Sequence, residues 1–347
     1  MIYKFGEKMK FFISILMLLM LPLSSSAHHS FSSTFHTDQF VEIEGVITRV
    51  LWRNPHVMFM IDVTNEDGEI IEWEIEANSL SLLRRAEISR ERFNVGDQVR
   101  VSGWPSRYHD TEMFVINMLL PSDEEVLWWL SARPLWSNNT IGNWDAWRTD
   151  SGNASDNTIN GIFGVWTTNF VSRNGGLWND NYPLTEFAAN ARNEYDPGSS
   201  NNPLLNCQPK GMPFIMEQPY PSQFIDMGDT IIWHGEEYDT MRIIYMDPDN
   251  SPNKPDNPIL GLSIGEWNDE MLVVKTNNIN YGSFDPTGIP LTNDVSLVER
   301  FIPVENGNRI IYEVEVTDPN IFTETITLDS TWTRATTETV SDYDCTT

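Results

Sequence analysis

Basic residues are scarce in this chain. Lys and Arg together number 22 against 50 Asp and Glu, which gives a formal net charge of −28 at pH 7. Nucleic acids and anionic lipid headgroups are themselves negatively charged, so a surface of this sign repels both. We therefore expect neither nucleic acid nor a membrane surface among the partners, and we expect cationic ligands to be favoured.

Long apolar runs are absent except at the N-terminus. There, three lysines precede an apolar stretch over residues 11–23, and the small residues Ser25-Ser26-Ala27 follow it. The stretch is short for a membrane span, and this three-part order is that of a secretory signal. We expect residues 1–27 to be a signal peptide that is removed. The mature protein would then be soluble, periplasmic or secreted, and without a transmembrane segment.

Cysteine is also rare, with Cys207 and Cys345 as the two examples. An even count in an oxidising compartment predicts one disulfide between them. Such a bond would close a long loop and tie the C-terminal tail to the second half of the chain. The alternative is a pair of buried thiols.

Residues 28–120 show the pattern of a small β-barrel domain. Strands are expected at 41–52, 56–64, 69–77, 98–104 and 112–120, with a short helix at 79–86 between the third and fourth. Asp67-Gly68 supplies the turn residues of a hairpin. Three strands, a helix and two strands is the order of the OB-fold, a five-stranded barrel.

Short motifs in this region occur in a fixed order. They are Ala27-His28-His29-Ser30-Phe31, Gly45-Val46-Ile47, Trp52-Arg53-Asn54-Pro55-His56, Leu82-Leu83-Arg84-Arg85 and Gly96-Asp97-Gln98-Val99. Together they resemble an uncharacterised family of exported bacterial proteins that carry a His-His-Ser-Phe-like mature N-terminus and an Asn-Pro-His motif. The resemblance implies export and a small β-barrel, with no established activity.

Histidines are the clearest candidates for a metal site. Cleavage after Ala27 would start the mature chain at His28-His29. Copper(II) prefers nitrogen ligands. Three are available here: the α-amine of the mature chain, the imidazole of His28 or His29, and the imidazole of His56. The alternative is that the terminus is disordered and that His56 merely follows a turn.

Residues 121–160 form a connector that contains five of the thirteen tryptophans, set among polar residues. One interpretation is that these indoles pack against the neighbouring barrels. The other is that they form a platform for a partner or a glycan, because indole faces stack on sugars and cations.

Residues 161–347 are expected to form a second domain, an antiparallel barrel of eight or so strands, with one helix at 183–195. Gly164-Val165-Trp166 resembles the Gly-x-Trp signature of lipocalins, and Arg334 on the last strand is placed to pack on Trp166. Residues 207–213, 242–247, 261–267 and 299–301 also resemble a second uncharacterised region of exported bacterial proteins. The lipocalin resemblance implies a cavity for one small ligand. The alternative is a barrel filled by its own aromatic side chains.

Charged and aromatic residues on the strands of this barrel are the candidate ligand contacts. They are Trp166, Arg242, Tyr245, Trp267, Glu299 and Arg300. If the charged members face the interior they must be paired, because an unpaired buried charge is very costly. Alternation alone leaves their orientation open, because a one-residue shift of register reverses every face.

The fold prediction is therefore all-β, an OB-like barrel followed by a lipocalin-like barrel. The leading functional hypothesis is an exported protein that binds a small molecule or an envelope partner, with copper as a candidate cofactor at its N-terminus. The alternative is an enzyme. One version is a copper oxidoreductase built on His28, His29 and His56, and another is an acid–base enzyme using Arg242, Glu299 and His234.

Overall fold

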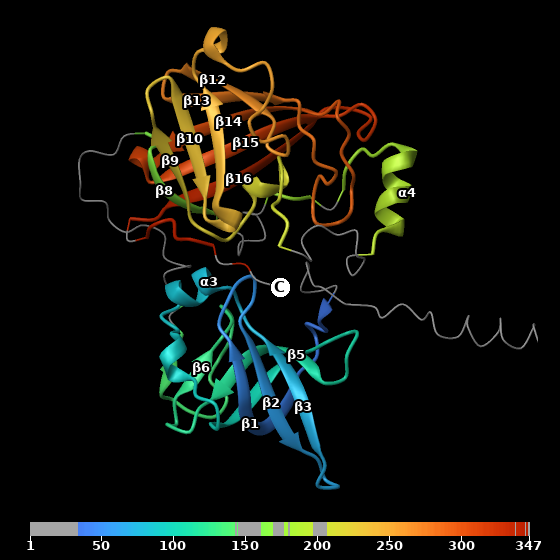
Figure 1. The fold of residues 1–347 in the computed structure, drawn as a ribbon, viewed down its shortest axis with the longest axis vertical. Coiled ribbons are helices and arrows are strands. Elements are labelled where there is room, and N and C mark those ends of the chain that lie inside the picture. Colours follow the sequence, from blue (N-terminus) through green and yellow to red (C-terminus); the bar gives the residue numbers. More distant parts are fainter. Residues whose placement is uncertain are drawn as a thin grey trace, which may run out of the picture.

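A computed structural model describes residues 34–142, 144, 161–168, 177–179, 181–196, 207–336, 338–343 and 345. It confirms the all-β fold class, with a closed five-stranded barrel in the N-terminal part and a nine-stranded barrel in the C-terminal part (Figure 1). None of the described helices is long and apolar enough to cross a membrane.

The first sheet contains seven strands in the order β3-β2-β1-β4-β5-β6-β7, and a parallel pairing of β3 with β5 closes five of them into a ring. The strands are β1 (Val41–Leu51), β2 (Met58–Thr64), β3 (Ile70–Glu76), β4 (Gln98–Pro105), β5 (Glu112–Leu119), β6 (Glu125–Leu127) and β7 (Thr140–Ile141). Helix α3 (Leu80–Arg85) follows β3, as predicted, and buries Leu82 and Leu83 in the core. The centre of that core is aromatic, with Phe59, Phe93 and Trp128 in mutual ring contact.

The connector continues the first sheet rather than leaving it. Glu125 on β6 is fully buried and accepts hydrogen bonds from the backbone N–H groups of Leu135, Trp136 and Ser137 at 2.8–2.9 Å. Burial alone would raise the pKa of this carboxyl, but these donors lower the pKa below its ordinary value. Trp128 and Trp144 are buried in the first core, which favours the packing interpretation for the described indoles.

Nine strands close the second barrel in the order β10-β11-β12-β13-β14-β15-β16-β8-β9. They are β8 (Gly164–Thr168), β9 (Ser222–Asp226), β10 (Thr230–Gly235), β11 (Thr240–Tyr245), β12 (Leu262–Asn268), β13 (Met271–Asn277), β14 (Ser296–Val304), β15 (Arg309–Thr317) and β16 (Ile326–Arg334). Helix α4 (Glu186–Glu194) lies outside the barrel, within the predicted helical range.

One pairing departs from the expected antiparallel pattern. β11 and β12 are parallel, with Ile244 opposite Ser263 and Tyr245 opposite Ile264. The sixteen-residue connection between them brings the chain back beside the last residues of β11, so that β12 starts there and runs in the same direction. A tight turn would have reversed the direction of β12.

The second barrel closes by the pairing of β16 with β8, and Arg334 packs on Trp166 there, as predicted. The guanidinium of Arg334 lies 4.3 Å from the ring centre of Trp166, which is fully buried. Arg334 also donates to the carbonyl oxygens of Phe163 and Gly161 at 2.8 and 2.6 Å. A Cβ at Gly164, whose φ is +143°, would lie 2.2 Å from the Arg334 guanidinium, so only glycine fits there.

The two barrels meet through a buried carboxylate. Glu236, in the β10–β11 connection, is 1% exposed and accepts hydrogen bonds from Ser81 and Arg84 of α3. It also accepts the backbone N–H of Ser341 from the C-terminal tail at 3.0 Å. A second ion pair joins Arg85 to Glu338 of the tail at 2.6 Å. The tail therefore lies between the barrels and contacts both.

A disulfide fixes the end of this tail. Cys207 and Cys345 are bonded across a sequence separation of 138 residues, so the predicted pairing is confirmed and the alternative of two thiols is wrong. Beside it, Tyr343 packs on Tyr220 and Tyr238, and Cys345 forms a bridge with Asn54 of the first barrel.

Replacing both cysteines with serine should lower the free energy of unfolding by about 2–5 kcal/mol, because the loop that the bond closes is long. Urea denaturation monitored by tryptophan fluorescence measures this, and hydrogen exchange at the Ser341 and Tyr343 amides should accelerate more than exchange in β14 and β15. Reductant should shift the wild-type midpoint and leave the double variant unchanged. An identical midpoint for the two proteins would contradict a stabilising role.

Candidate functional site

The interior of the second barrel holds a buried ion pair. Arg242 on β11 and Glu299 on β14 are 1% and 0% exposed, and Arg242 Nη1 donates to Glu299 Oε1 at 2.9 Å. The remaining donors of Arg242 reach Ser263 Oγ at 3.0 Å and Thr276 Oγ1 at 2.7 Å. Tyr312 Oη donates to Glu299 Oε1 at 3.0 Å. Burial and the neighbouring Glu299 raise the pKa of Tyr312, so this hydroxyl remains a donor.

This network satisfies its own members. Each charged atom of the pair has a partner inside the barrel, which is the condition under which two buried charges are tolerated. Aromatic side chains fill the space around it, with Phe224, Phe301 and Trp332 in mutual ring contact. The middle of the barrel is therefore packed, as in the second of the two alternatives for its interior.

The other predicted contact residues lie elsewhere. Arg300 is partly exposed on the outer surface, where it pairs with Glu315 at 2.8 Å. Tyr245 is also on the outside, and its hydroxyl donates to Asp256 at 2.6 Å. Trp166 lies beneath Arg334 at the closure. Trp233 on β10 shares a face of the sheet with its cross-strand neighbour Arg242. His234 is the next residue along β10 and therefore projects from the opposite face. The structure thus does not bring His234 to Arg242 and Glu299.

A cavity of about 680 Å³ opens at one end of the barrel. Its lining residues come from the start of β8, the β9–β10 turn, the residues after β11 and the end of β12: Phe163, Asp226, Gly228, Ile231, Met246, Pro248, Gly265, Glu266 and Trp267. We call this the mouth cavity. Trp267 is the predicted contact residue that lines it. The Trp267 side chain is 45% exposed, and its ring meets that of Phe163 edge to face at 6.0 Å.

The opposite end of the barrel is closed by the residues before β9. Ile215 and Met216 are fully buried there, and Gln218 is 2% exposed. Burial raises the pKa of the adjacent Glu217 carboxyl to about 7. Sequence patterns gave no signal for these residues, because the segment contains neither a strand alternation nor a helical period.

Only one of the three predicted metal-binding histidines can be placed. His56 is 32% exposed, and its Nδ1 lies 3.1 Å from the carbonyl oxygen of Ala77 and 3.3 Å from Oε1 of the buried Glu76. His28 and His29 lie outside the described residues. Within the described part of the chain, no three His, Cys, Asp or Glu side chains are grouped in a way that would hold a metal ion.

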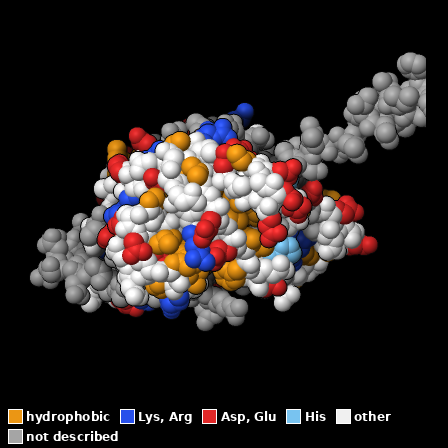
Figure 2. Space-filling model, turned by 90° about the horizontal axis from the view of Figure 1, so that it is seen from below, with side chains coloured by type: hydrophobic (Ala, Val, Ile, Leu, Met, Phe, Trp, Pro, Cys, Tyr) orange, Lys and Arg blue, Asp and Glu red, His pale blue; other side chains and the backbone are white. Residues whose placement is uncertain are grey.

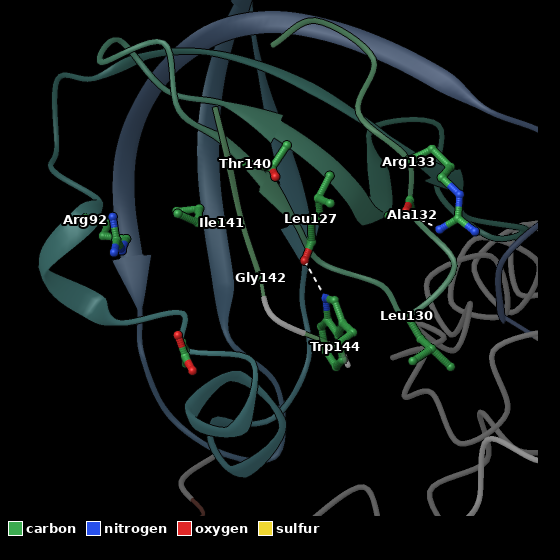
Figure 3. Close-up of a pocket in the computed structure, with 10 residues that line it drawn as sticks. Arg92, Leu127, Leu130, Ala132, Arg133, Thr140, Ile141, Gly142 and Trp144 are labelled. Carbon is green, nitrogen blue, oxygen red and sulfur yellow. Dashed lines mark hydrogen bonds between the residues drawn. The ribbon is translucent and has the colours of Figure 1, made fainter. Parts of the chain in front are cut away.

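Apolar side chains also reach the surface of the first barrel. Figure 2 shows hydrophobic side chains gathered on the face seen from the lower end of Figure 1, with acidic groups around them. The exposed large hydrophobic residues of this barrel are Phe40, Ile70, Val95, Tyr108 and Leu135. A separate cavity of about 420 Å³ lies beside β6 and β7 (Figure 3).

Residues 17–113 match the model of a family of unknown function (DUF6152). This match confirms that the N-terminal part of the chain contains an uncharacterised domain. No curated protein matches the chain. Among solved structures, the crystal structure of the mitochondrial single-stranded DNA-binding protein Rim1 from S. cerevisiae is similar at 14% identity and a TM-score of 0.20, covering 24% of this chain and 94% of that one.

Replacing Glu299 with alanine should lower the free energy of unfolding by about 3–5 kcal/mol, because Arg242 would remain buried without its counter-charge. Urea denaturation measures the loss. The matched control, Glu315→Ala, removes the partly exposed partner of Arg300 and should cost less than about 1 kcal/mol. The double replacement Arg242→Met with Glu299→Leu should recover most of the stability. Equal effects of Glu299→Ala and Glu315→Ala would contradict this account.

Proposed function

We propose that this protein is an exported binding protein whose ligand occupies the mouth cavity of the second barrel. The observation that carries the proposal is the cavity itself, whose volume of about 680 Å³ lies within the range of small-molecule sites. Because Arg242 is paired with Glu299 in the middle of the barrel and aromatic side chains surround this pair, we expect the ligand at the open end. A lipocalin-like mode of binding is consistent with this location.

The lining indicates the charge of the ligand. Asp226 and Glu266 contribute carboxylates, and the lining includes neither Lys nor Arg. Trp267 and Phe163 add aromatic rings, which attract cations through their π faces. We therefore propose a small organic cation with apolar substituents as the ligand class.

Neither carboxylate is committed to a strong interaction. Glu266 pairs with Lys275 at 3.2 Å, but both side chains are more than 60% exposed, so this pair contributes little. Asp226 accepts the backbone N–H of Gly228 at 2.9 Å through one oxygen. The other oxygen of Asp226 remains able to accept from a ligand.

Export is the second part of the proposal. The sequence supports it through the signal-like residues 1–27, and the Cys207–Cys345 bond supports it because disulfides persist in oxidising compartments. An envelope location would expose the mouth cavity to small molecules that enter from outside the cell.

The mouth cavity can be tested with choline as the probe. The comparison is the binding of its uncharged isostere, in which a carbon atom replaces the nitrogen. Calorimetry on the mature protein should give saturable one-to-one binding of choline and weaker binding of the isostere. Trp267→Ala and Asp226→Asn should each weaken choline binding by about ten-fold, because each removes an attraction worth about 1–2 kcal/mol.

The matched control for this experiment is Phe187→Ala, which removes an exposed aromatic ring from α4 and should leave choline binding unchanged. Equal binding of the two probes, or no saturable binding of choline, would contradict an organic-cation site at the mouth.

A second candidate function is copper(II) binding at the mature N-terminus, and the geometry of His56 favours it. Metal-ligating histidines usually have their second ring nitrogen held by a carboxylate or a backbone carbonyl. Glu76 and Ala77 hold Nδ1 of His56 in this way, which leaves Nε2 as the ligating nitrogen.

We infer that the N-terminal histidines can reach His56 from the start of the described chain. Phe35 packs on Phe114 at a ring distance of 5.8 Å, and Phe114 is the cross-strand neighbour of Glu76. Six residue steps separate His28 from Thr34, so an extended chain spans about 20 Å between them. The proposed ligands are the α-amine of residue 28, an imidazole of His28 or His29, and His56.

Copper(II) binding to the mature protein should be tight and one-to-one by calorimetry, with a nitrogen-rich EPR spectrum. One extra residue before His28 should weaken binding because it moves the α-amine, and His56→Ala should weaken it because it removes a ligand. His234→Ala is the control and should change nothing. Binding that is indifferent to the first two changes would contradict this site.

A further inference from the structure

The cavity beside β6 and β7 differs in charge from the mouth cavity. We call it the sheet-edge cavity, and its volume is about 420 Å³. It is lined by Glu87, Arg92, Leu127, Leu130, Ala132, Arg133, Thr140, Ile141, Gly142 and Trp144. Figure 3 shows Arg92 and Arg133 on opposite sides of this set, with Leu127 and Ile141 between them. Two guanidinium groups and one carboxylate line this site, whereas the mouth cavity is lined by carboxylates and no Lys or Arg.

The apolar wall of the sheet-edge cavity is held in place by specific contacts. The Trp144 indole Nε1 donates to the carbonyl oxygen of Leu127 at 2.7 Å, drawn as the dashed line in Figure 3. Gly142 has a φ of +109°, and a Cβ there would lie 2.4 Å from the same carbonyl oxygen. Close approach of this segment to β6 therefore requires glycine at this position. Gly142 lies between Ile141, which pairs with Val126 of β6, and Trp144, which is hydrogen-bonded to Leu127.

The two arginines are not equivalent. Arg92 already pairs with Glu124, whose Oε1 lies 3.0 Å from Nη1. Arg133 donates to the carbonyl oxygen of its neighbour Ala132 at 3.2 Å and pairs with no carboxylate in the described part of the chain. The Arg133 side chain is also exposed. Its guanidinium thus keeps donors that an anionic ligand can accept from, in the planar arrangement that suits a carboxylate.

We propose that the sheet-edge cavity binds a small amphiphilic carboxylate, such as a short-chain fatty acid. The carboxylate accepts hydrogen bonds from Arg133, and the hydrocarbon chain packs on Leu127, Leu130 and Ile141. Transfer of that chain from water to an apolar wall supplies the affinity, and Arg133 supplies the selection for an acid. This site is separate from the mouth cavity and prefers a ligand of opposite charge.

Octanoate tests the proposal, with octanol as its uncharged counterpart, by calorimetry on the mature protein. Octanoate should bind saturably with one-to-one stoichiometry and more tightly than octanol. Arg133→Gln should weaken octanoate binding by about ten-fold, which is the loss expected for a charge-assisted hydrogen bond. Thr140→Tyr should abolish binding, because Thr140 is exposed on the edge strand and a larger side chain there fills the cavity.

Two controls isolate the site. Arg49→Gln neutralises another exposed arginine of the first barrel, on β1, and should leave octanoate binding unchanged. Trp267→Ala alters the mouth cavity and should also leave it unchanged, so failure of one site is distinguishable from failure of the other. No saturable binding, equal binding of octanol, or wild-type affinity in Arg133→Gln would overturn the proposal.

Discussion

The pairing of Arg242 with Glu299 is the constraint on which the second barrel depends. Two ions removed from water are tolerated only when each charged atom is matched, and here Ser263, Thr276 and Tyr312 complete the set. These groups come from β11, β12, β13, β14 and β15, so the network joins strands that backbone pairing alone would connect only to their neighbours. It also occupies the middle of the barrel, together with the aromatic side chains that surround it.

A second buried carboxylate organises the molecule on a larger scale. Glu236 of the second barrel accepts hydrogen bonds from Ser81 and Arg84 and from the tail at Ser341. Ser81 and Arg84 lie on α3, within or beside the Leu82-Leu83-Arg84-Arg85 motif, which is inside the segment that matches the family of unknown function. In this chain the motif faces the other barrel, and its arginines are engaged by Glu236 and Glu338. The end of the first barrel that carries α3 is therefore an interface rather than an open binding face.

Local patterns were sufficient for most of the fold. Alternation and turn residues predicted the strands of both barrels. Two long-range contacts were also predicted: Cys207–Cys345 from the even number of cysteines, and Trp166–Arg334 from the resemblance to the Gly-x-Trp signature. The residues of the candidate site were harder to predict from the sequence. Arg242 and Arg300 both lie in strand-like runs, yet one is buried and the other is on the surface, because register decides the face and alternation does not fix register. Glu236 gave no signal, since its partners are far away in sequence.

Net charge does not describe the linings of the individual cavities. The total of −28 sets the long-range field, but salt screens that field beyond about 8–10 Å, so a bound ligand responds mainly to its nearest groups. The mouth cavity has two carboxylates and no cation in its lining, whereas the sheet-edge cavity has Arg92, Arg133 and one carboxylate. The proposed anion site depends on Arg133, which pairs with no carboxylate in the described part of the chain. Local pairing, rather than net charge, is the basis on which we propose a different ligand class for each cavity.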